Sequence, residues 1–376
     1  MYKKVEAQID GKTITIETGK LAKQASGSIV IQSGETVVLV TAVAGKENKP
    51  ELGFLPLTIE YQEKLASVGR IPGNYFRREI GRPSDHEVLT CRIIDRPLRP
   101  LFADGYFSET QVIATVLSAD TQNDPDVLAL TGASCALTLS DIPFGGPVAG
   151  ARVGYINGDY VINPTANELK ESSMNMVVAC TRQAVVMVEG QADNLSEAEI
   201  LSAIFFVHDQ VQPLIDLQED LRATNGKEKR VVEPVPVDEA LLERVKQIAA
   251  EGMKKVSGIA DKLERGKAYD DLKKQVITEL DENGDRAREI NDLLGMYKKS
   301  YMRNMIVNDH IRLDGRSFDQ VRQISCEVGY LPRTHGSALF TRGETQALVT
   351  ATLGSERDQQ RVETLGGEEN NRFMLH

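Results

Sequence analysis

Alternating apolar and polar residues mark the first strands of the chain. Residues 4–17 alternate around Asp10 and Gly11, a pair typical of the tight turn of a β-hairpin. Strands are predicted to follow at residues 27–32 and 35–44, which are rich in Val and Ile. The chain therefore begins with the pattern of an antiparallel sheet.

Turn and cap signals continue to about residue 225 and mix helices with strands. Ser196 and Glu199 form a capping box for one long helix that is predicted to run towards Arg222. The other predicted elements are a hairpin that turns at Asn157-Gly158 (residues 151–156 and 160–162), an apolar helix at residues 132–140 and a buried strand at residues 186–189. This mixture indicates an α/β or α+β domain at residues 1–225.

The pattern changes after this domain. Pro234 and Pro236 mark a linker, and apolar residues then recur at helical spacing from residue 239 to residue 305. We predict an all-helical domain of two or three helices at residues 236–307. Its mixed charges are typical of a solvated helix surface.

An internal repeat links the two ends of the chain. Residues 27–47 return as residues 336–356, shifted by 309 positions, and the two segments agree at eleven positions. Residues 17–21 match residues 327–331 after a slip of one residue. The chain is therefore predicted to contain one whole domain and, at residues 310–376, the truncated start of a second copy.

Composition narrows the class of protein. The 376 residues are 41% hydrophobic and 26% charged, as in a globular protein with more than one domain. A net charge of −11 excludes a protein that coats nucleic acid with its whole surface, so any RNA site must be local. No apolar run approaches the roughly 20 residues that cross a bilayer, and the N-terminus lacks the apolar core of a secretory signal. We expect a cytoplasmic protein without a membrane partner.

The cysteines and histidines give no sign of disulfides or metal sites. The four cysteines lie far apart in apolar stretches, so buried thiols in a reducing compartment are expected (Cys91, Cys135, Cys180 and Cys326). None of the five histidines has ligand spacing to a cysteine, and no ATPase-type phosphate loop is present. We predict no metal ligand in this chain, and we interpret His335 as structural.

Arginines are concentrated between residues 70 and 99. This segment has seven arginines and no lysine, and a guanidinium can hold a phosphate through two parallel hydrogen bonds. Tyr75 and Phe76 precede Arg77 and Arg78, a pairing that can stack on bases and hold the backbone of single-stranded RNA. From the residues alone, a salt-bridged helix surface is an equally open interpretation.

A helix is predicted within this segment. Ser84 and Glu87 form its capping box, and Pro97 is predicted to end it. Arg92 and Arg96 are four residues apart and share one face. The residues predicted to face the core are Val88, Leu89 and Ile93.

Three motifs in the segment carry a family resemblance. Residues 75–79, 81–84 and 94–102 (YFRRE, GRPS and IDRPLRPLF) resemble the first RNase PH-like domain of the bacterial polynucleotide phosphorylase family, and residues 331–349 resemble the opening of its second. The resemblance covers the whole chain and implies an α+β, RNase PH-like fold (ribosomal protein S5 domain 2-like), with a helical domain between the copies. Tyr75 replaces the commonest Phe and Ile80 is inserted, but neither change removes an arginine.

The resemblance implies a phosphorolytic 3′-to-5′ exoribonuclease, a nucleotidyltransferase. Such an enzyme degrades single-stranded RNA, including mRNA, to nucleoside 5′-diphosphates, and it runs in reverse as a polymerase of diphosphates. The family assembles as homotrimeric rings with RNA in a central channel. It uses Mg²⁺ and inorganic phosphate, and partners in an RNA-degradation complex are also implied.

The resemblance also implies roles for individual residues. The RNA contacts at the channel entrance are assigned to Tyr75, Phe76, Arg77 and Arg78. A basic surface that guides RNA is assigned to Arg82, Arg92, Arg96 and Arg99. The catalytic aspartates, lysine and phosphate-holding groups belong to the family's second copy and are expected beyond His376. The first copy does not replace them, because its matching positions hold Leu169, Asn175 and Val177.

Two alternatives stay open. One is a non-catalytic RNA-binding or ring-scaffold protein, and the other is a ribonuclease that uses water instead of phosphate. Release of diphosphates or of monophosphates separates the two enzymatic interpretations.

Overall fold

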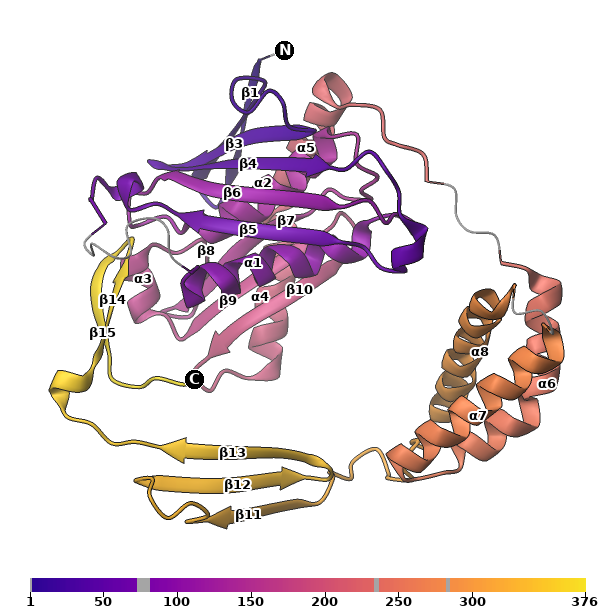
Figure 1. Ribbon diagram of the computed structural model, residues 1–376. Coiled ribbons are helices and arrows are strands. Elements are labelled where there is room, and N and C mark those ends of the chain that lie inside the picture. Colours follow the sequence, from indigo (N-terminus) through magenta and orange to yellow (C-terminus); the bar gives the residue numbers. More distant parts are fainter. Residues whose placement is uncertain (1, 73–81, 233–236, 282–284) are drawn as a thin grey trace. The chain divides into compact units, whose positions relative to one another are not determined.

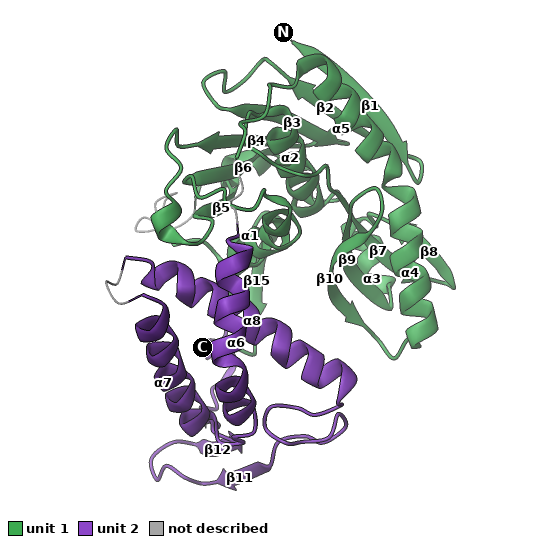
Figure 2. Cartoon of the chain, turned by 90° about the vertical axis from the view of Figure 1, so that its right-hand side faces the viewer, with its two compact units in different colours: residues 1–234, 360–376 green, residues 235–359 purple. Residues whose placement is uncertain are grey.

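The computed structural model describes residues 2–72, 82–232, 237–281 and 285–376. The chain forms two compact units, residues 1–234 with residues 360–376, and residues 235–359 (Figure 2). Among the described residues, the first unit contains two large β-sheets, a two-stranded hairpin and five α-helices, and the second contains three α-helices and a three-stranded sheet (Figure 1).

The first sheet of unit 1 has the strand order β1-β2-β3-β4-β6-β5. Its neighbouring strands are antiparallel except β5 and β6. Asp10 and Gly11 adopt φ values of 47° and 73° and form the predicted turn between β1 and β2. The strands are β1 (Lys3–Ile9), β2 (Lys12–Thr18), β3 (Gly27–Ser33), β4 (Thr36–Ala44), β5 (Leu57–Glu63) and β6 (Thr110–Ser118).

The second sheet is antiparallel, with the order β10-β9-β7-β8. The predicted hairpin turn at Asn157 and Gly158 is confirmed. The prediction of a buried strand at residues 186–189 is wrong, because β10 is an edge strand and Met187 alone of its eight residues is buried. The strands are β7 (Ala149–Ile156), β8 (Asp159–Ile162), β9 (Met174–Cys180) and β10 (Val185–Ala192).

Helix α2 (Pro125–Leu139) is buried along its whole length and packs against β3 and β4 of one sheet and β7 of the other. Its apolar residues cover all sides, which is typical of a helix inside a core. It begins earlier than the predicted residue 132, because Asp124 caps it and Pro125 occupies its first turn.

The remaining helices of unit 1 lie on the outer surfaces of this core. The capping box of Ser196 and Glu199 is confirmed, but the single long helix predicted from it is two helices. The break falls at Val211, since Pro213 in the next turn has no N–H group to continue the hydrogen bonding. The helices are α1 (Asp85–Leu98), α3 (Ala166–Glu171), α4 (Glu197–Gln210) and α5 (Gln212–Asn225).

Unit 2 combines a three-helix cluster with a three-stranded sheet. The buried face of α6 follows the helical spacing of Val245, Ala249 and Met253 and packs against the other two helices. The elements are α6 (Glu239–Ser257), α7 (Lys262–Leu280), α8 (Ala287–Asn308), β11 (Ile324–Val328), β12 (Gly336–Arg342) and β13 (Thr345–Ala351).

The internal repeat appears in the strand register. Gly27 pairs with Ala42 and Ser33 with Thr36, and the residues 309 positions later pair in the same way, Gly336 with Ala351 and Arg342 with Thr345. The one-residue slip is reproduced too. Glu17 pairs with Val30, and the matching Glu327 pairs with Leu339. The two segments therefore form the same three-stranded sheet.

A last hairpin and four short 3₁₀ helices complete the chain. The hairpin consists of β14 (Gln360–Thr364) and β15 (Gly367–Asn371) and belongs to unit 1. The 3₁₀ helices are η1 (Pro50–Leu52), η2 (Leu65–Val68), η3 (Arg99–Leu101) and η4 (Glu356–Asp358). No helix in the described part of the chain is both long and apolar enough to cross a membrane.

Gly27 and its repeat partner Gly336 should respond differently to a methyl group. A Cβ atom at residue 27 would lie 2.0 Å from the carbonyl oxygen of Ala136 in α2, whereas at residue 336 the nearest atom, Ala351 Cβ, is 3.4 Å away. We expect Gly27→Ala to lower the free energy of unfolding by about 1–3 kcal/mol through overpacking. Gly336→Ala is the matched control, and urea unfolding should show little change; equal losses in both variants would contradict the packing assigned to α2.

Candidate nucleic-acid interface

Helix α1 carries the last three arginines before residue 100 to its C-terminal end and packs against β5. The predicted capping box is present: Glu87 N donates to Ser84 Oγ at 3.1 Å, and Ser84 N donates to Glu87 Oε2 at 2.7 Å. The other carboxylate oxygen of Glu87 accepts from the backbone N–H of Glu63, at the end of β5. The box therefore starts the helix and also fixes it to the sheet.

The face of α1 that is buried differs from the prediction. Val88 and Leu89 are 47% and 50% exposed, so they do not face the core as predicted, while Ile93 is half-buried against it. The buried residues are Thr90, Ile94, Pro97 and Leu98. The predicted residues and the buried residues both follow helical spacing. The buried set includes the polar Thr90, so a search for apolar residues does not select it. Pro97 does not end the helix, because it lies in a last turn that extends to Leu98.

The structure divides the four arginines assigned to the basic surface into two pairs. Arg99 bonds both carboxylate oxygens of Asp95, at 2.7 and 2.8 Å, and donates to the carbonyls of Leu55 and Leu57. Arg96 pairs with Glu189 of β10. Arg82 and Arg92 have exposed side chains that make no hydrogen bond or ion pair with the described residues. Arg99 thus has a structural role and Arg96 is held by a surface ion pair, whereas Arg82 and Arg92 have neither kind of contact within the described part of the chain.

Four predicted RNA contacts lie outside the described residues. They are Tyr75, Phe76, Arg77 and Arg78. Their assignment to RNA stays a prediction.

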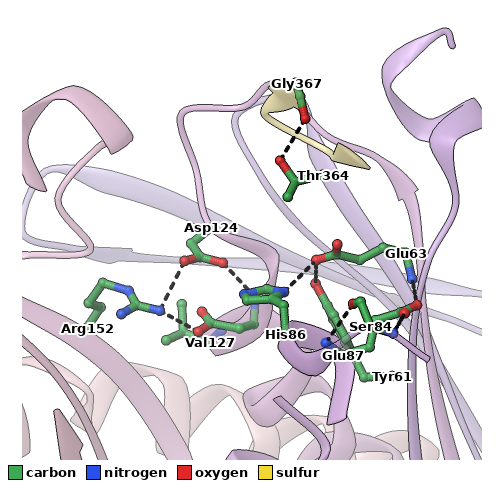
Figure 3. A network of polar contacts seen from close by, with 11 residues as sticks. Tyr61, Glu63, Ser84, His86, Glu87, Asp124, Val127, Arg152, Thr364 and Gly367 are labelled. Atoms are coloured by element: carbon green, nitrogen blue, oxygen red, sulfur yellow. Dashed lines mark hydrogen bonds and ion pairs between the residues drawn. The ribbon is translucent and has the colours of Figure 1, made fainter. Parts of the chain in front are cut away.

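A polar network connects the start of α1 to the start of α2 (Figure 3). His86 Nδ1 lies 3.1 Å from Glu63 Oε1, and Tyr61 Oη donates to the same oxygen at 2.9 Å. The hydrogen bond to Glu63 raises the pKa of His86 from 6.5 to about 9, although partial burial opposes this, and the charge of Asp124 adds to the rise. His86 is therefore a cation at neutral pH, placed between carboxylates of two elements.

The same network ends in a buried cluster of charges. Arg152 Nη2 lies 3.0 Å from Asp124 and also pairs with Asp126, while Nη1 donates to the amide oxygen of Asn175. The side chains of Arg152 and Asp126 are only 11% and 2% exposed. Burial raises the pKa of Asp126 and the neighbouring Asp124 adds to this, whereas Arg152 opposes the rise. The cluster is held together by one guanidinium.

This cluster does not fit a divalent metal ion. Carboxylate oxygens are the ligands that Mg²⁺ prefers, but here both carboxylates accept from Arg152, which supplies the positive charge itself. Among the described residues, no group of three or more His, Cys, Asp or Glu side chains is placed to hold a metal. Asn175, which matches a catalytic position of the resembled family, is a partner of Arg152 in this copy.

Sequence reasoning missed this cluster and the part played by His86. A usable signal was present, since an arginine within an apolar strand needs a buried partner. Asp124 and Asp126 flank a proline directly before an apolar run, where a helix starts. Spacing alone does not bring these residues together, because Arg152 lies 28 and 26 positions from its two partners.

Two minor candidates have structural explanations. His335 Nδ1 accepts from Leu353 N at 3.0 Å after the end of β13, a contact that agrees with the structural interpretation. The expectation of four buried thiols is wrong for Cys326, which is exposed on β11, while Cys135 and Cys180 are buried and Cys91 is partly buried.

Family models match most of the chain. The model described as the 3′ exoribonuclease family, domain 1, matches residues 10–143 and again residues 320–374, and its domain 2 matches residues 146–210. Residues 240–317 match a model described as the polyribonucleotide nucleotidyltransferase RNA-binding domain. The repeat found in the sequence is thus matched twice by one domain model.

Similar proteins are named polyribonucleotide nucleotidyltransferase. The chain is 68% identical to that of Desulfotalea psychrophila over 377 residues, covering 100% of the chain and 54% of the relative. It is 55% identical to that of Desulfosudis oleivorans over 372 residues, covering 99% and 52%. The chain therefore spans about half the length of these curated relatives. Rice Rrp46 is a solved structure with 16% identity and a TM-score of 0.44, covering 58% of this chain and 95% of that one.

The buried charge cluster should be more important for stability than a comparable cluster at the surface. We expect Arg152→Met to lower the free energy of unfolding by about 3–5 kcal/mol, because it leaves two carboxylates without their cation. Adding Asp126→Asn should recover part of the loss. Arg182→Met is the matched control, since Arg182 also pairs with two acids, Asp216 and Glu219, but at the surface. Its loss should stay below about 1 kcal/mol in the same denaturant titration; similar losses for both arginines would contradict the assignment.

The titration of His86 should reveal its contact with Glu63. Because the folded pKa is raised to about 9, protonated His86 stabilises the fold fully below its ordinary value of 6.5, and this contribution is lost as pH rises through about 9. NMR of the imidazole, assigned with a His86→Gln variant, should show a midpoint well above 6.5. Glu63→Gln should move it back down, and an unshifted midpoint in the wild type would contradict the network.

Proposed function

The chain belongs to the 3′ exoribonuclease family, and from this premise we propose that it is the RNA-guiding part of a phosphorolytic 3′-to-5′ exoribonuclease. The enzyme degrades single-stranded RNA, including mRNA, to nucleoside 5′-diphosphates and works in reverse as a nucleotidyltransferase. The names of the similar proteins and the matched domain models support this activity.

The observation that carries the proposal is that two arginines of the segment have no ion-pair partner among the described residues. Arg82 lies just before α1 and Arg92 lies on it, both exposed in a protein of net charge −11. Exposed arginines without a carboxylate partner are suited to phosphate, because their fork of N–H donors matches two phosphate oxygens. Arg96 joins this surface when phosphate competes with Glu189, since a surface ion pair is weak.

In the proposal, Tyr75 and Phe76 stack on bases while Arg77 and Arg78 hold the backbone. Stacking accepts any base, and phosphate contacts carry no sequence information. Such a site holds the strand without preferring a sequence. This is the property that progressive shortening of RNA needs.

We place the chemistry outside the first copy. Its matching positions hold Leu169, Asn175 and Val177, and Asn175 is a partner of Arg152. None of these side chains is an acid, a base or a strong metal ligand. In the proposal, Mg²⁺ and inorganic phosphate act with groups of the second copy, where developing charge on the transferred phosphoryl group is stabilised.

The proposal includes an assembly and a location. The enzyme is a cytoplasmic homotrimer that threads RNA through a central channel and meets partners in RNA degradation. The four free cysteines support a reducing compartment. The match of the helical segment to a family RNA-binding domain adds a second RNA contact to the assembly.

One rival is favoured by a specific observation. A cluster in which Arg152 engages both nearby carboxylates is what a purely binding domain would show. A non-catalytic RNA-binding or scaffold protein would bind RNA and release no nucleotide from the complete protein, whereas a hydrolytic enzyme would release monophosphates.

RNA binding can be tested with paired arginine variants. Arg77→Ala with Arg78→Ala, and separately Arg82→Ala with Arg92→Ala, should weaken binding of a labelled oligo(A). Each pair should also reduce the slope of the logarithm of the binding constant against the logarithm of the salt concentration by about 1.4. Each contact to a phosphate of single-stranded RNA contributes about 0.7 to this slope. Fluorescence anisotropy at several salt concentrations provides both values.

The matched control removes two arginines elsewhere, the half-buried Arg182 and the exposed Arg222, as Arg182→Ala with Arg222→Ala. It changes the net charge by the same amount and should leave the slope unchanged. If the control and the test pairs weaken binding equally, the effect is one of net charge and the proposed interface is wrong.

A further inference from the structure

The hairpin of β14 and β15 is ordered by contact with the first copy. Its two strands pair with each other from Gln360–Asn371 to Thr364–Gly367 and with no other strand among the described residues. An isolated two-stranded hairpin is marginally stable in water. Its side chains at positions such as Arg361 are exposed, so its order depends on what its turn contacts.

The turn of the hairpin is held by two kinds of contact. Leu365 packs, partly buried, against the hydrophobic core of unit 1. Arg70 Nη2 donates to the backbone carbonyls of Thr364 and Leu365, the latter at 2.7 Å, and Nη1 lies 4.0 Å from Glu363. A guanidinium presents several fixed donors, so one arginine can hold two neighbouring carbonyls where a lysine has a single point of charge.

Arg70 is itself fixed to the sheet. It follows η2, and its backbone N–H donates to the carbonyl of Leu65 at 3.0 Å. Within η2, the carbonyl of Ser67 accepts from Ala119 N, directly after β6, at 3.0 Å. The guanidinium is therefore presented from a rigid base, and its contact can set the position of the hairpin.

The contact joins two functional parts of the chain. The hairpin lies within residues 320–374, the second match to the exoribonuclease domain model, 294 positions after Arg70. Arg70 is the first arginine of the arginine segment, five residues before Tyr75. Figure 3 draws the hairpin residues Thr364 and Gly367 in the same close-up as the network of Glu63 and His86.

We propose that Arg70 is a positioning residue. It docks the hairpin of the second copy beside η2, where the arginine segment begins. The proposal rests on the proposed function for its biological meaning, since it ties the copy that receives RNA to the copy in which we place the chemistry. Arg70 acts on the hairpin through backbone carbonyls, so the identity of the hairpin side chains matters less than the guanidinium. In the proposal, Arg70 docks the hairpin and does not contact RNA. Direct RNA contact by Arg70 is the alternative that the experiment distinguishes.

Hydrogen–deuterium exchange on the whole chain, without RNA, tests the docking directly. In Arg70→Ala, the amides of residues 360–371 should exchange about 10-fold faster, because the hairpin loses two hydrogen bonds that hold its turn. Arg70→Lys should restore part of the protection, since one ammonium can still reach a carbonyl. Protection of α2 should stay unchanged in both variants, which shows that the core remains folded.

Arg361→Ala is the matched control. It removes an arginine from the hairpin itself, where the one ion pair of Arg361 with a described residue is the exposed pair with Glu368 at 3.3 Å, and exchange should not change. Leu365→Ala is a second route to the same release and should raise hairpin exchange without touching Arg70.

Two results would overturn the proposal. Wild-type exchange rates of the hairpin in Arg70→Ala would show that the contact does not hold it. A flatter salt dependence of RNA binding in Arg70→Ala, with hairpin exchange unchanged, would make Arg70 an RNA contact instead. Because the exchange measurement contains no RNA, its failure is distinct from a failure of the proposed RNA interface.

Discussion

The burial of helix α2 between two sheets is the constraint on which the rest of unit 1 depends. All 15 of its residues are buried, and the sheets approach it so closely that glycine is required at the contacts. A Cβ atom at Gly132 would lie 2.8 Å from Val40 and 3.1 Å from Ile29, and one at Gly150 would lie 2.9 Å from Leu130. Such close packing fixes the position of both sheets relative to α2. The residues at the two ends of the helix therefore have little room to move.

Both ends of α2 are therefore places where polar groups have fixed positions. At its start, Asp124 caps the helix and pairs with Arg152, and the network of His86 and Glu63 continues from there to α1 and the arginine segment. At its end, Lys229 donates to the carbonyls of Leu137 and Ser140, and burial lowers the pKa of this lysine to about 8. The core thus positions the proposed RNA surface, while the charges of the Arg152 cluster hold the start of α2 to the second sheet.

The sequence predicted what local patterns encode and missed what the tertiary structure decides. The turn at Asp10-Gly11, the capping boxes at Ser84 and Ser196 and the repeated sheet are local, and all are present. The buried face of α1 depends on which helical stripe meets β5, so Val88 and Leu89 were wrongly assigned to the core. Sequence spacing also cannot separate Arg99, which is engaged by two carbonyls and Asp95, from Arg92, which has no partner in the described ranges. That distinction exists only once the fold brings residues 55 and 57 to the end of α1.

The central claim is that the first copy binds and guides RNA while the chemistry belongs to other residues. Phosphate-dependent release of ADP from a poly(A) oligonucleotide with Mg²⁺, measured on a polypeptide of this sequence together with RNA binding, tests it most directly. The account predicts bound RNA and no ADP, since the matching positions of the first copy hold Leu169, Asn175 and Val177, and Asp124 and Asp126 are both engaged by Arg152. Release of ADP would contradict it and would place catalytic groups within these residues.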